Sequence, residues 1–247
     1  MRDDREGLPL SVVIPAYNES ENLPALIDEV TVALRGLCAF EIIVVDDASE
    51  DATPAILGAA LYRIAELRVL RHRDRCGQSA AIRNGVKASL GEWIATLDGD
   101  GQNDPADIPR LLDARAAAGD IGLLAGWRVQ RKDSASKRRA SRWANAIRAW
   151  FLRDDTPDTG CGLKLFRRDA FLELPYFDHM HRYLPALMQR AGWRTVSVPV
   201  SHRPRAAGVS KYDNLGRALV GIRDLAGVAW LIRRSSVTGV EEARREP

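Results

Sequence analysis

The sequence has few cysteines and no long apolar run, and these absences exclude several classes of protein. The three cysteines, Cys38, Cys76 and Cys161, are far apart and odd in number. They form neither a disulfide framework nor a CxxC metal pair, which favours a reducing compartment. The first residues lack the apolar core of a secretory signal, and no stretch reaches the roughly 18 apolar residues that cross a bilayer. We therefore expect a chain that does not span a membrane by itself.

A strong net charge is also missing, but the charges are unevenly placed. The 247 residues carry 36 Lys and Arg against 33 Asp and Glu, a formal charge of +3, which gives no reason to expect a nucleic-acid partner. Between Trp127 and Arg153, however, nine residues are basic and only Asp133 is acidic. Aromatic and aliphatic residues in the same stretch form an apolar stripe. A basic amphipathic segment suits an anionic partner or a membrane surface, and the plain alternative is a solvated helix face.

Short apolar runs alternate with helical patterns through the first half of the chain. Strands are predicted at 11–14, 41–45, 67–70 and 93–97, and the first helix is predicted to begin at Ser20 as its N-cap. This alternation predicts an α/β fold with a Rossmann-like, mostly parallel sheet covered by helices on both faces. Ligands bind beyond the carboxyl ends of such strands, where Pro15, Asp46, Asp47 and Asp98 fall.

The second half continues with predicted strands at 121–125, 163–166 and 195–200. Helices are predicted at 107–118 and 180–191, and a last helical region begins near residue 213. No internal repeat or low-complexity linker separates the two halves. The pattern predicts one domain over residues 1–247 that ends in amphipathic helices facing a membrane.

The segment Asp98-Gly-Asp-Gly-Gln102 directly follows a predicted strand. Two carboxylates one residue apart at a strand end can hold a hard divalent cation such as Mg²⁺ or Mn²⁺, which keeps open positions for substrate phosphates. The plain alternative is a polar turn in which the aspartates cap the next helix. The position opposite Asp46 and Asp47 favours the metal site.

Three ordered motifs resemble family 2 glycosyltransferases of the GT-A fold. They are Ser11-Val-Val-Ile-Pro-Ala-Tyr-Asn-Glu19, Val44-Val-Asp-Asp-Ala-Ser49 and Asp98-Gly-Asp-Gly-Gln-Asn-Asp-Pro105. Four further segments are similar to the polyprenyl-phosphate glycosyltransferases typified by dolichyl-phosphate mannose synthase. These segments are Gly126-Trp-Arg128, Lys137-Arg-Arg-Ala-Ser-Arg-Trp-Ala-Asn145, Asp158-Thr-Gly160 and Gly208-Val-Ser-Lys211. The resemblance covers about residues 9 to 230.

This resemblance implies a role for each matching residue. Nucleotide-sugar binding is implied for Pro15, Tyr17, Glu19, Asp47, Gly99, Gln102, Arg205 and Lys211. A metal ion, Mg²⁺ or Mn²⁺, is implied at Asp98, Asp100 and Gln102. The implied catalytic residues are Asp98, Asp100, Arg128, Arg138 and Ser141, and the acceptor phosphate is implied to lie against Lys137, Arg138 and Ser141.

The resemblance also implies the reaction. It is inverting transfer of a sugar from a nucleoside diphosphate to a polyprenyl phosphate by a peripheral enzyme at the cytoplasmic membrane face, with a small membrane protein as an optional partner. Residues 9–126 would bind the donor and metal, 127–214 the acceptor phosphate, and 215–247 the membrane interface. A phosphate monoester, with a second pKa near ~6, is already a nucleophile at neutral pH and needs positive groups to orient it.

Two other functions stay open on the sequence alone. The same fold could act on a sugar or polysaccharide hydroxyl, which requires a general base, and Asp158 is the candidate for that role. A non-catalytic nucleotide-binding or scaffold protein would also use the basic segment. His179 and His181 are predicted to be surface or packing residues rather than zinc ligands, because they have no Cys or His partners at ligand spacing.

Overall fold

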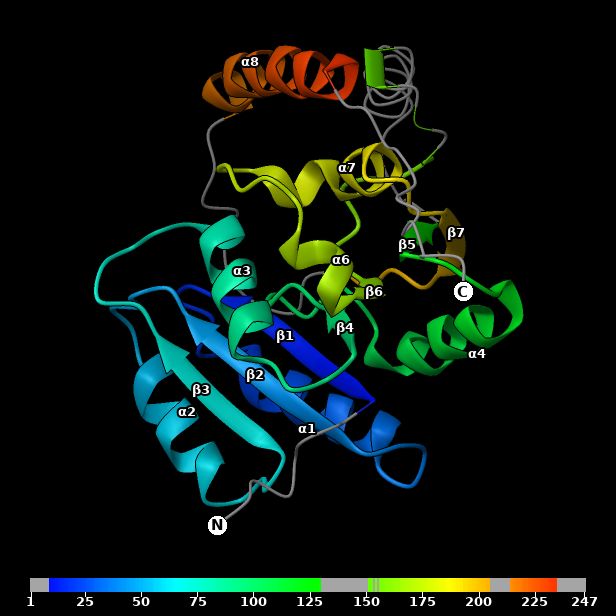
Figure 1. Ribbon diagram of the computed structural model, residues 1–247. Helices are drawn as coiled ribbons and strands as arrows, with labels where there is room; N and C mark the ends of the chain where they lie inside the picture. Colours follow the sequence, from blue (N-terminus) through cyan, green and yellow to red (C-terminus); the bar gives the residue numbers. More distant parts are fainter. Residues whose placement is uncertain (1–8, 130–150, 153, 155, 205–213, 235–247) are drawn as a thin grey trace, which may run out of the picture.

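The predicted α/β architecture is confirmed in the computed structural model, which describes residues 9–129, 151–152, 154, 156–204 and 214–234 (Figure 1). Seven strands form one sheet in the order β3-β2-β1-β4-β6-β5-β7. Their bounds are β1 Leu10–Ala16, β2 Phe40–Asp46, β3 Leu67–Arg71, β4 Trp93–Thr96, β5 Leu123–Arg128, β6 Lys164–Arg167 and β7 Thr195–Val200. Every residue of β1, β2 and β4 is buried, as expected for central strands covered on both faces.

Strand β6 runs antiparallel to its neighbours β4 and β5, whereas all other neighbouring strands are parallel. An antiparallel strand begins at the edge where parallel strands end. The residues before Lys164 therefore meet the residues that follow β1, β2 and β4. Arg128, at the end of β5, reaches the same carboxyl edge.

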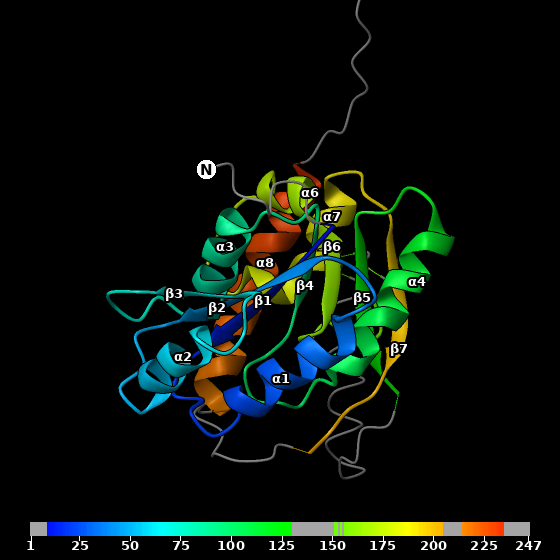
Figure 2. The same ribbon diagram turned by 90° about the horizontal axis from the view of Figure 1, so that it is seen from below.

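Helices cover both faces of the sheet, as the view in Figure 2 shows. One face carries α1 (Leu23–Leu34), α2 (Thr53–Leu61) and α4 (Ile108–Ala118), preceded by the 3₁₀ turn η1 (Pro105–Asp107). The other carries α3 (Gln78–Ala88), α6 (Arg168–Leu172), the 3₁₀ turn η2 (Met180–Tyr183) and α7 (Leu184–Arg190). The last helix, α8 (Asn214–Arg233), packs on α7 (Figure 1). None of the described helices is long and apolar enough to cross a membrane.

The predicted start of the first helix at Ser20 is wrong. Asn22 occupies the N-cap and α1 begins at Leu23, with Pro24 in the first turn, where its missing N–H costs nothing. The Ser20 N–H instead donates to Oδ2 of Asp51 at 3.3 Å. Ser20 thus belongs to the turn between β1 and α1 rather than to the helix.

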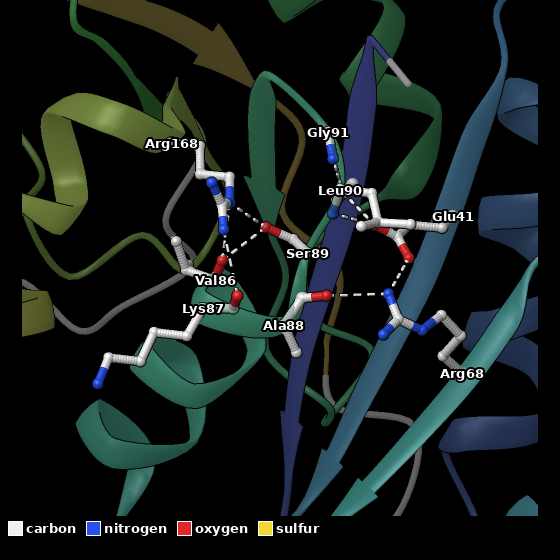
Figure 3. Close-up of polar contacts among 10 residues, drawn as sticks. Glu41, Arg68, Val86, Lys87, Ala88, Ser89, Leu90, Gly91 and Arg168 are labelled. Carbon is white, nitrogen blue, oxygen red and sulfur yellow. Dashed lines mark hydrogen bonds and ion pairs between the residues drawn. The ribbon is translucent and has the colours of Figure 1, made fainter. Parts of the chain in front are cut away.

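A polar network fastens α3 at the edge of the sheet opposite the strand ends (Figure 3). The fully buried Glu41 carboxylate accepts hydrogen bonds from Ser11 Oγ at 2.7 Å, the Leu90 N–H at 2.6 Å and Arg68 Nη1 at 2.5 Å. Arg168 donates to the last carbonyls of α3, at Val86 (3.1 Å) and at residue 87 (3.2 Å), which caps that end of the helix. These contacts fix the direction of α3, whose first turn lies at the opposite edge.

Candidate active site

A cleft of about 410 Å³ lies at the carboxyl edge of the sheet. One side, the first wall, is formed by residues that lie at or after the ends of β1, β2 and β4, or in and before the first turns of α3. They are Pro15, Ala16, Tyr17, Glu19, Asp47, Arg75, Gly77, Gln78, Ala81, Asp98, Gly99, Asp100 and Gln102. The other side, the second wall, consists of Thr159, Gly160, Gly162, His181 and Arg182, from the segment before β6 and from η2.

The described residues that were predicted to bind the nucleotide sugar or the metal gather in this cleft. They are Pro15, Tyr17, Glu19, Asp47, Asp98, Gly99, Asp100 and Gln102. The predicted residues Lys137, Arg138, Ser141, Arg205 and Lys211 lie outside the described residues, so their roles stay predictions. Arg128 is described but does not line the cleft.

Asp47 is held by the loop that precedes α3. Its Oδ1 accepts hydrogen bonds from the Cys76 N–H at 2.8 Å and contacts His72 Nδ1 at 2.7 Å, and its Oδ2 accepts from the Gly77 N–H at 2.8 Å. Gly77 has a φ of 87°, a conformation that favours glycine. The carboxylate therefore fixes this loop against the sheet and at the same time faces the cleft.

Asp98 and Asp100 form a pair of carboxylates at the centre of the first wall. Burial and the neighbouring Asp100 carboxylate raise the pKa of Asp98 to about 6. Oδ1 of Asp98 accepts a hydrogen bond from Gln78 Nε2 at 2.7 Å, and the Gln102 N–H donates to Oδ1 of Asp100 at 3.1 Å. A side chain at Gly162 would clash with Oδ2 of Asp98.

This donor set fits a divalent cation. Two neighbouring carboxylates repel each other, and a bound cation would relieve this repulsion. Their oxygens are also the ligands that Mg²⁺ and Mn²⁺ prefer. Gly162 of the second wall lies against Asp98 and has no side chain to occupy the space between them. The residues present are therefore suited to hold the predicted metal at Asp98 and Asp100.

Arg128 forms an ion pair with Asp158. The guanidinium donates to both carboxylate oxygens, from Nε at 2.6 Å and from Nη2 at 2.8 Å, and both side chains are largely buried. The paired carboxylate raises the pKa of Arg128, although burial opposes the effect. A carboxylate that accepts two hydrogen bonds from an arginine is a poor proton acceptor, which argues against Asp158 as a general base.

The comparison with protein families decides the identity of the chain. The model of the family described as glycosyl transferase family 2 matches residues 11–174, which include the cleft residues from Pro15 to Gly162. The chain belongs to glycosyl transferase family 2.

Two curated relatives resemble this glycosyltransferase over most of its length. Dodecaprenyl-phosphate galacturonate synthase of Rhizobium johnstonii is 34% identical over 244 residues, which cover 96% of this chain and 71% of the relative. Undecaprenyl-phosphate 4-deoxy-4-formamido-L-arabinose transferase of Sodalis glossinidius is 36% identical over 207 residues, which cover 83% of this chain and 63% of the relative.

Solved structures have the same GT-A fold at low sequence identity. Glucosyl-3-phosphoglycerate synthase from Mycobacterium tuberculosis, in complex with Mn²⁺, UDP and glucosyl-3-phosphoglycerate, has a TM-score of 0.69 and 20% identity. That match covers 95% of this chain and 83% of the other. A mannosyltransferase from Pyrobaculum calidifontis, in complex with GDP-Man and Mn²⁺, has a TM-score of 0.67 and 19% identity, covering 94% of this chain and 66% of the other.

The first turn of α3 joins three parts of the glycosyltransferase cleft. Gly77 donates to Asp47, Gln78 donates to Asp98, and Ser79 Oγ lies 2.7 Å from Nδ1 of His181 on η2. Three consecutive residues thus connect the end of β2, the carboxylate pair and the second wall. Neither Gln78 nor Ser79 was predicted to belong to the site.

Other residues of the cleft were also missed. The guanidinium of Arg75 lies 4.0 Å above the ring of Tyr17, in a cation–π contact at the mouth of the first wall. His181 packs, as predicted, but its ring also lines the cleft. Arg182 lines the cleft beside it. In the sequence, His181 and Arg182 are visible only as two polar residues at the start of a predicted helix. That pattern does not indicate which residues of the rest of the chain face them.

Proposed function

We propose that this glycosyltransferase transfers a sugar from a nucleoside diphosphate sugar to a polyprenyl phosphate, with inversion at the anomeric carbon. The donor nucleotide binds to the first wall at Tyr17 and Asp47. Asp98 and Asp100 hold Mg²⁺ or Mn²⁺, with Gln102 beside them. The names of both curated relatives, which concern polyprenyl phosphates, support this acceptor, and the Mn²⁺ and nucleotide complexes of the structural neighbours support the cofactor.

The composition of the second wall is the observation that favours a phosphate over a hydroxyl as the acceptor. Among the described residues that line the cleft, every carboxylate belongs to the first wall. His181, the titratable base of the second wall, has a pKa well below its usual value because of burial and nearby cations, and its Nδ1 contacts Ser79. A hydroxyl acceptor needs a base on this side, whereas a phosphate dianion needs none. The second wall therefore suits a phosphate acceptor.

The reaction then needs binding and charge compensation rather than proton transfer. An oxygen of the acceptor phosphate forms a bond to the anomeric carbon while the bond from that carbon to the nucleoside diphosphate breaks. The metal, when bound, neutralises the charge on the departing diphosphate. The carboxylates of the first wall stabilise the positive charge that develops on the sugar. The cleft orients the two substrates for attack from opposite sides of the carbon.

The two strands that flank the basic segment in the sequence reach the same edge of the sheet as the cleft. Strand β5 ends at Arg128 and β6 begins at Lys164, both at the carboxyl edge. The described residues on either side of the stretch that contains Lys137, Arg138 and Ser141 therefore lie at the edge of the sheet that carries the cleft. This supports the proposed division of one domain into a donor half at about 9–126 and an acceptor-phosphate half at about 127–214.

Helix α8 offers a surface for the membrane that holds the acceptor. Val228 and Ala229 are buried, whereas Ile222 is 67% and Trp230 is 60% exposed. Arg223, Arg233 and Arg234 are also exposed, and the guanidinium of Arg234 lies 5.6 Å from the Trp230 ring. Exposed Trp and Ile flanked by arginines suit the interface of an anionic membrane. This supports peripheral binding at the cytoplasmic face.

The acceptor is tested with a matrix of nucleotide sugars, each offered with a short polyprenyl phosphate or with the corresponding alcohol, in Mg²⁺ or Mn²⁺. We expect a lipid-linked sugar with the phosphate and none with the alcohol, and Asp98→Asn should abolish it. Transfer to a sugar or lipid hydroxyl, with polyprenyl phosphate inert, would overturn the proposal.

Membrane binding is tested separately by flotation with anionic vesicles. We expect the wild type to float with the vesicles and Trp230→Ser to bind them less. Binding of neither protein would contradict direct attachment through α8 and would favour a membrane-protein partner.

A further inference from the structure

Arg182 is a cation of the cleft that has no anionic partner in the described part of the chain. It lies on η2, is half-buried and lines the cleft, yet its side chain makes no hydrogen bond or ion pair with any described residue. Several other half-buried arginines bind carboxylates or backbone carbonyls. Arg68 pairs with Glu41, Arg128 pairs with Asp158, and Arg168 binds the carbonyls of α3.

The backbone holds Arg182 firmly at this place. Its neighbours Met180 and Tyr183 are buried in the core on that face of the sheet, and its N–H donates to the His179 carbonyl at 3.0 Å. Next to it, His181 is joined to Ser79 through its ring at 2.7 Å and through its N–H at 3.4 Å. The guanidinium is therefore presented to the cleft by a fixed segment, and it does not need the rest of the chain to rearrange.

The charges of the two walls explain what such a cation is for. The first wall holds carboxylates and, in the proposed function, a divalent cation between them. Arg182 approaches from the opposite side, where the remaining described residues of the wall, Thr159, Gly160, Gly162 and His181, are uncharged near neutral pH. A partly desolvated guanidinium is costly without a counter-charge, and its planar fork matches the oxygens of a phosphate or carboxylate.

We propose that Arg182 binds an oxyanion of the substrates on the second wall, and that this oxyanion is the phosphate monoester of the acceptor. The proposal rests on the proposed function and adds a residue to it. Two hydrogen bonds from the guanidinium hold the phosphate while its free oxygen faces the anomeric carbon. A carboxylate on the transferred sugar is the other source of the same chemistry, and kinetics distinguish the two.

The test compares Arg182→Gln and Arg182→Lys with the wild type and with Lys87→Gln. The Lys87 side chain is exposed at the far end of α3 and points away from the network (Figure 3), so this control removes one positive charge outside the cleft. We expect Arg182→Gln to raise the KM for a short polyprenyl phosphate at least tenfold, with the KM for the donor unchanged. Arg182→Lys should recover part of the loss, because it keeps the charge but not the fork.

The outcomes separate the possible sources. A raised KM for the donor alone, found only with acidic sugars, would identify the sugar carboxylate as the partner and overturn the acceptor assignment. Unchanged KM values for both substrates would overturn the proposal entirely. A fall in melting temperature with unchanged KM values would show a structural role only, which also overturns it.

Binding of farnesyl phosphate by isothermal titration calorimetry separates this inference from the proposed function. If the wild type binds this probe and Arg182→Gln does not, Arg182 is an oxyanion-binding residue even where no sugar is transferred. If the wild type forms a lipid-linked sugar but the wild type and Arg182→Gln bind farnesyl phosphate equally, the proposed function is kept and the proposed role of Arg182 is wrong.

Discussion

The two walls of the cleft differ in how far the protein satisfies its own polar groups. On the first wall, both oxygens of Asp47 contact protein donors, and Asp98 is held by Gln78. On the second wall, Arg182 has no anionic partner among the described residues, and Gly160 and Gly162 offer no side chains.

This difference indicates two modes of recognition. A wall whose carboxylates are already hydrogen-bonded has its geometry before a ligand arrives, so that little ordering is required when the ligand binds. A wall of small residues and an unpaired cation is completed by the substrate itself. In the proposed function, the donor side is thus preorganised, and the acceptor side depends on the charge of its ligand. The difference between the two walls is tested by variants in the cleft and by a variant in the polar network at the opposite edge of the sheet.

The largest effect is expected from Glu41→Ala, far from both walls. Removal of this fully buried carboxylate leaves the Leu90 N–H without its acceptor and Arg68 without its partner, which should lower the free energy of unfolding by about 3 kcal/mol. Urea unfolding measures the loss, and activity per folded molecule should stay unchanged. The control is Glu66→Ala, whose solvent-screened ion pair with the exposed Arg35 is expected to contribute far less to the free energy of unfolding.

Gly162→Ala, a substitution on the second wall, should displace the Asp98 carboxylate of the first wall. The added Cβ would clash with Oδ2 of Asp98, so the carboxylate must turn away from the position that suits a metal. We expect kcat to fall about 100-fold, as for a displaced charged group in other active sites. Gly160→Ala is the matched control, because its Cβ would meet Arg128 Nη2 at 3.3 Å and not the carboxylate pair. Equal losses in the two variants would contradict this explanation.

Gln78→Ala should loosen the metal site without removing a ligand. The hydrogen bond from Nε2 to Asp98 orients the carboxylate, and loss of such a supporting contact typically weakens metal binding about 10-fold. Titration of Mn²⁺ by electron paramagnetic resonance measures the affinity independently of turnover. An unchanged affinity would show that Asp98 keeps its orientation without Gln78.

The smallest effect is a pH dependence of stability from His181. Burial and the nearby cations Lys164 and Arg182 lower the pKa of His181 well below its usual value. Below about pH 6.5, His181 is therefore protonated in the unfolded chain while it stays neutral in the folded chain, which favours the unfolded state. This residue should therefore lower stability by about 1 kcal/mol as the pH falls from 6.5 to 5.5. Urea unfolding of His181→Gln and of the wild type across this range should give a shallower loss in the variant; parallel curves would contradict the assignment.

The sequence was sufficient to predict the part of the first wall that follows the strands. Buried parallel strands read as continuous apolar runs, and their carboxyl ends meet at one edge, so Pro15, Asp47 and Asp98 had to converge there. The structure adds contacts between residues far apart in the sequence, which no local sequence pattern shows. Gln78 is the first residue of α3, and only the position of this helix beside the end of β4 makes it a partner of Asp98.

The second wall was harder to predict for a physical reason. The apolar run at β6 indicates a strand but not its direction, and the antiparallel direction is what carries Thr159 to Gly162 into the cleft. Whether Arg182 is paired is likewise a tertiary property. The short helix α6 was missed because five residues give too little periodicity to distinguish a helix from a turn.

The first turn of α3 has a thermodynamic consequence. Because Gly77, Gln78 and Ser79 contact Asp47, Asp98 and His181 in succession, one turn joins the proposed nucleotide site, the proposed metal site and the second wall. Ligands that share such an element are linked, and linkage is reciprocal. Whatever factor a metal at the proposed site adds to the affinity for the nucleotide, the nucleotide must add to the affinity for the metal, so the two ligands of the proposed function bind as a coupled pair.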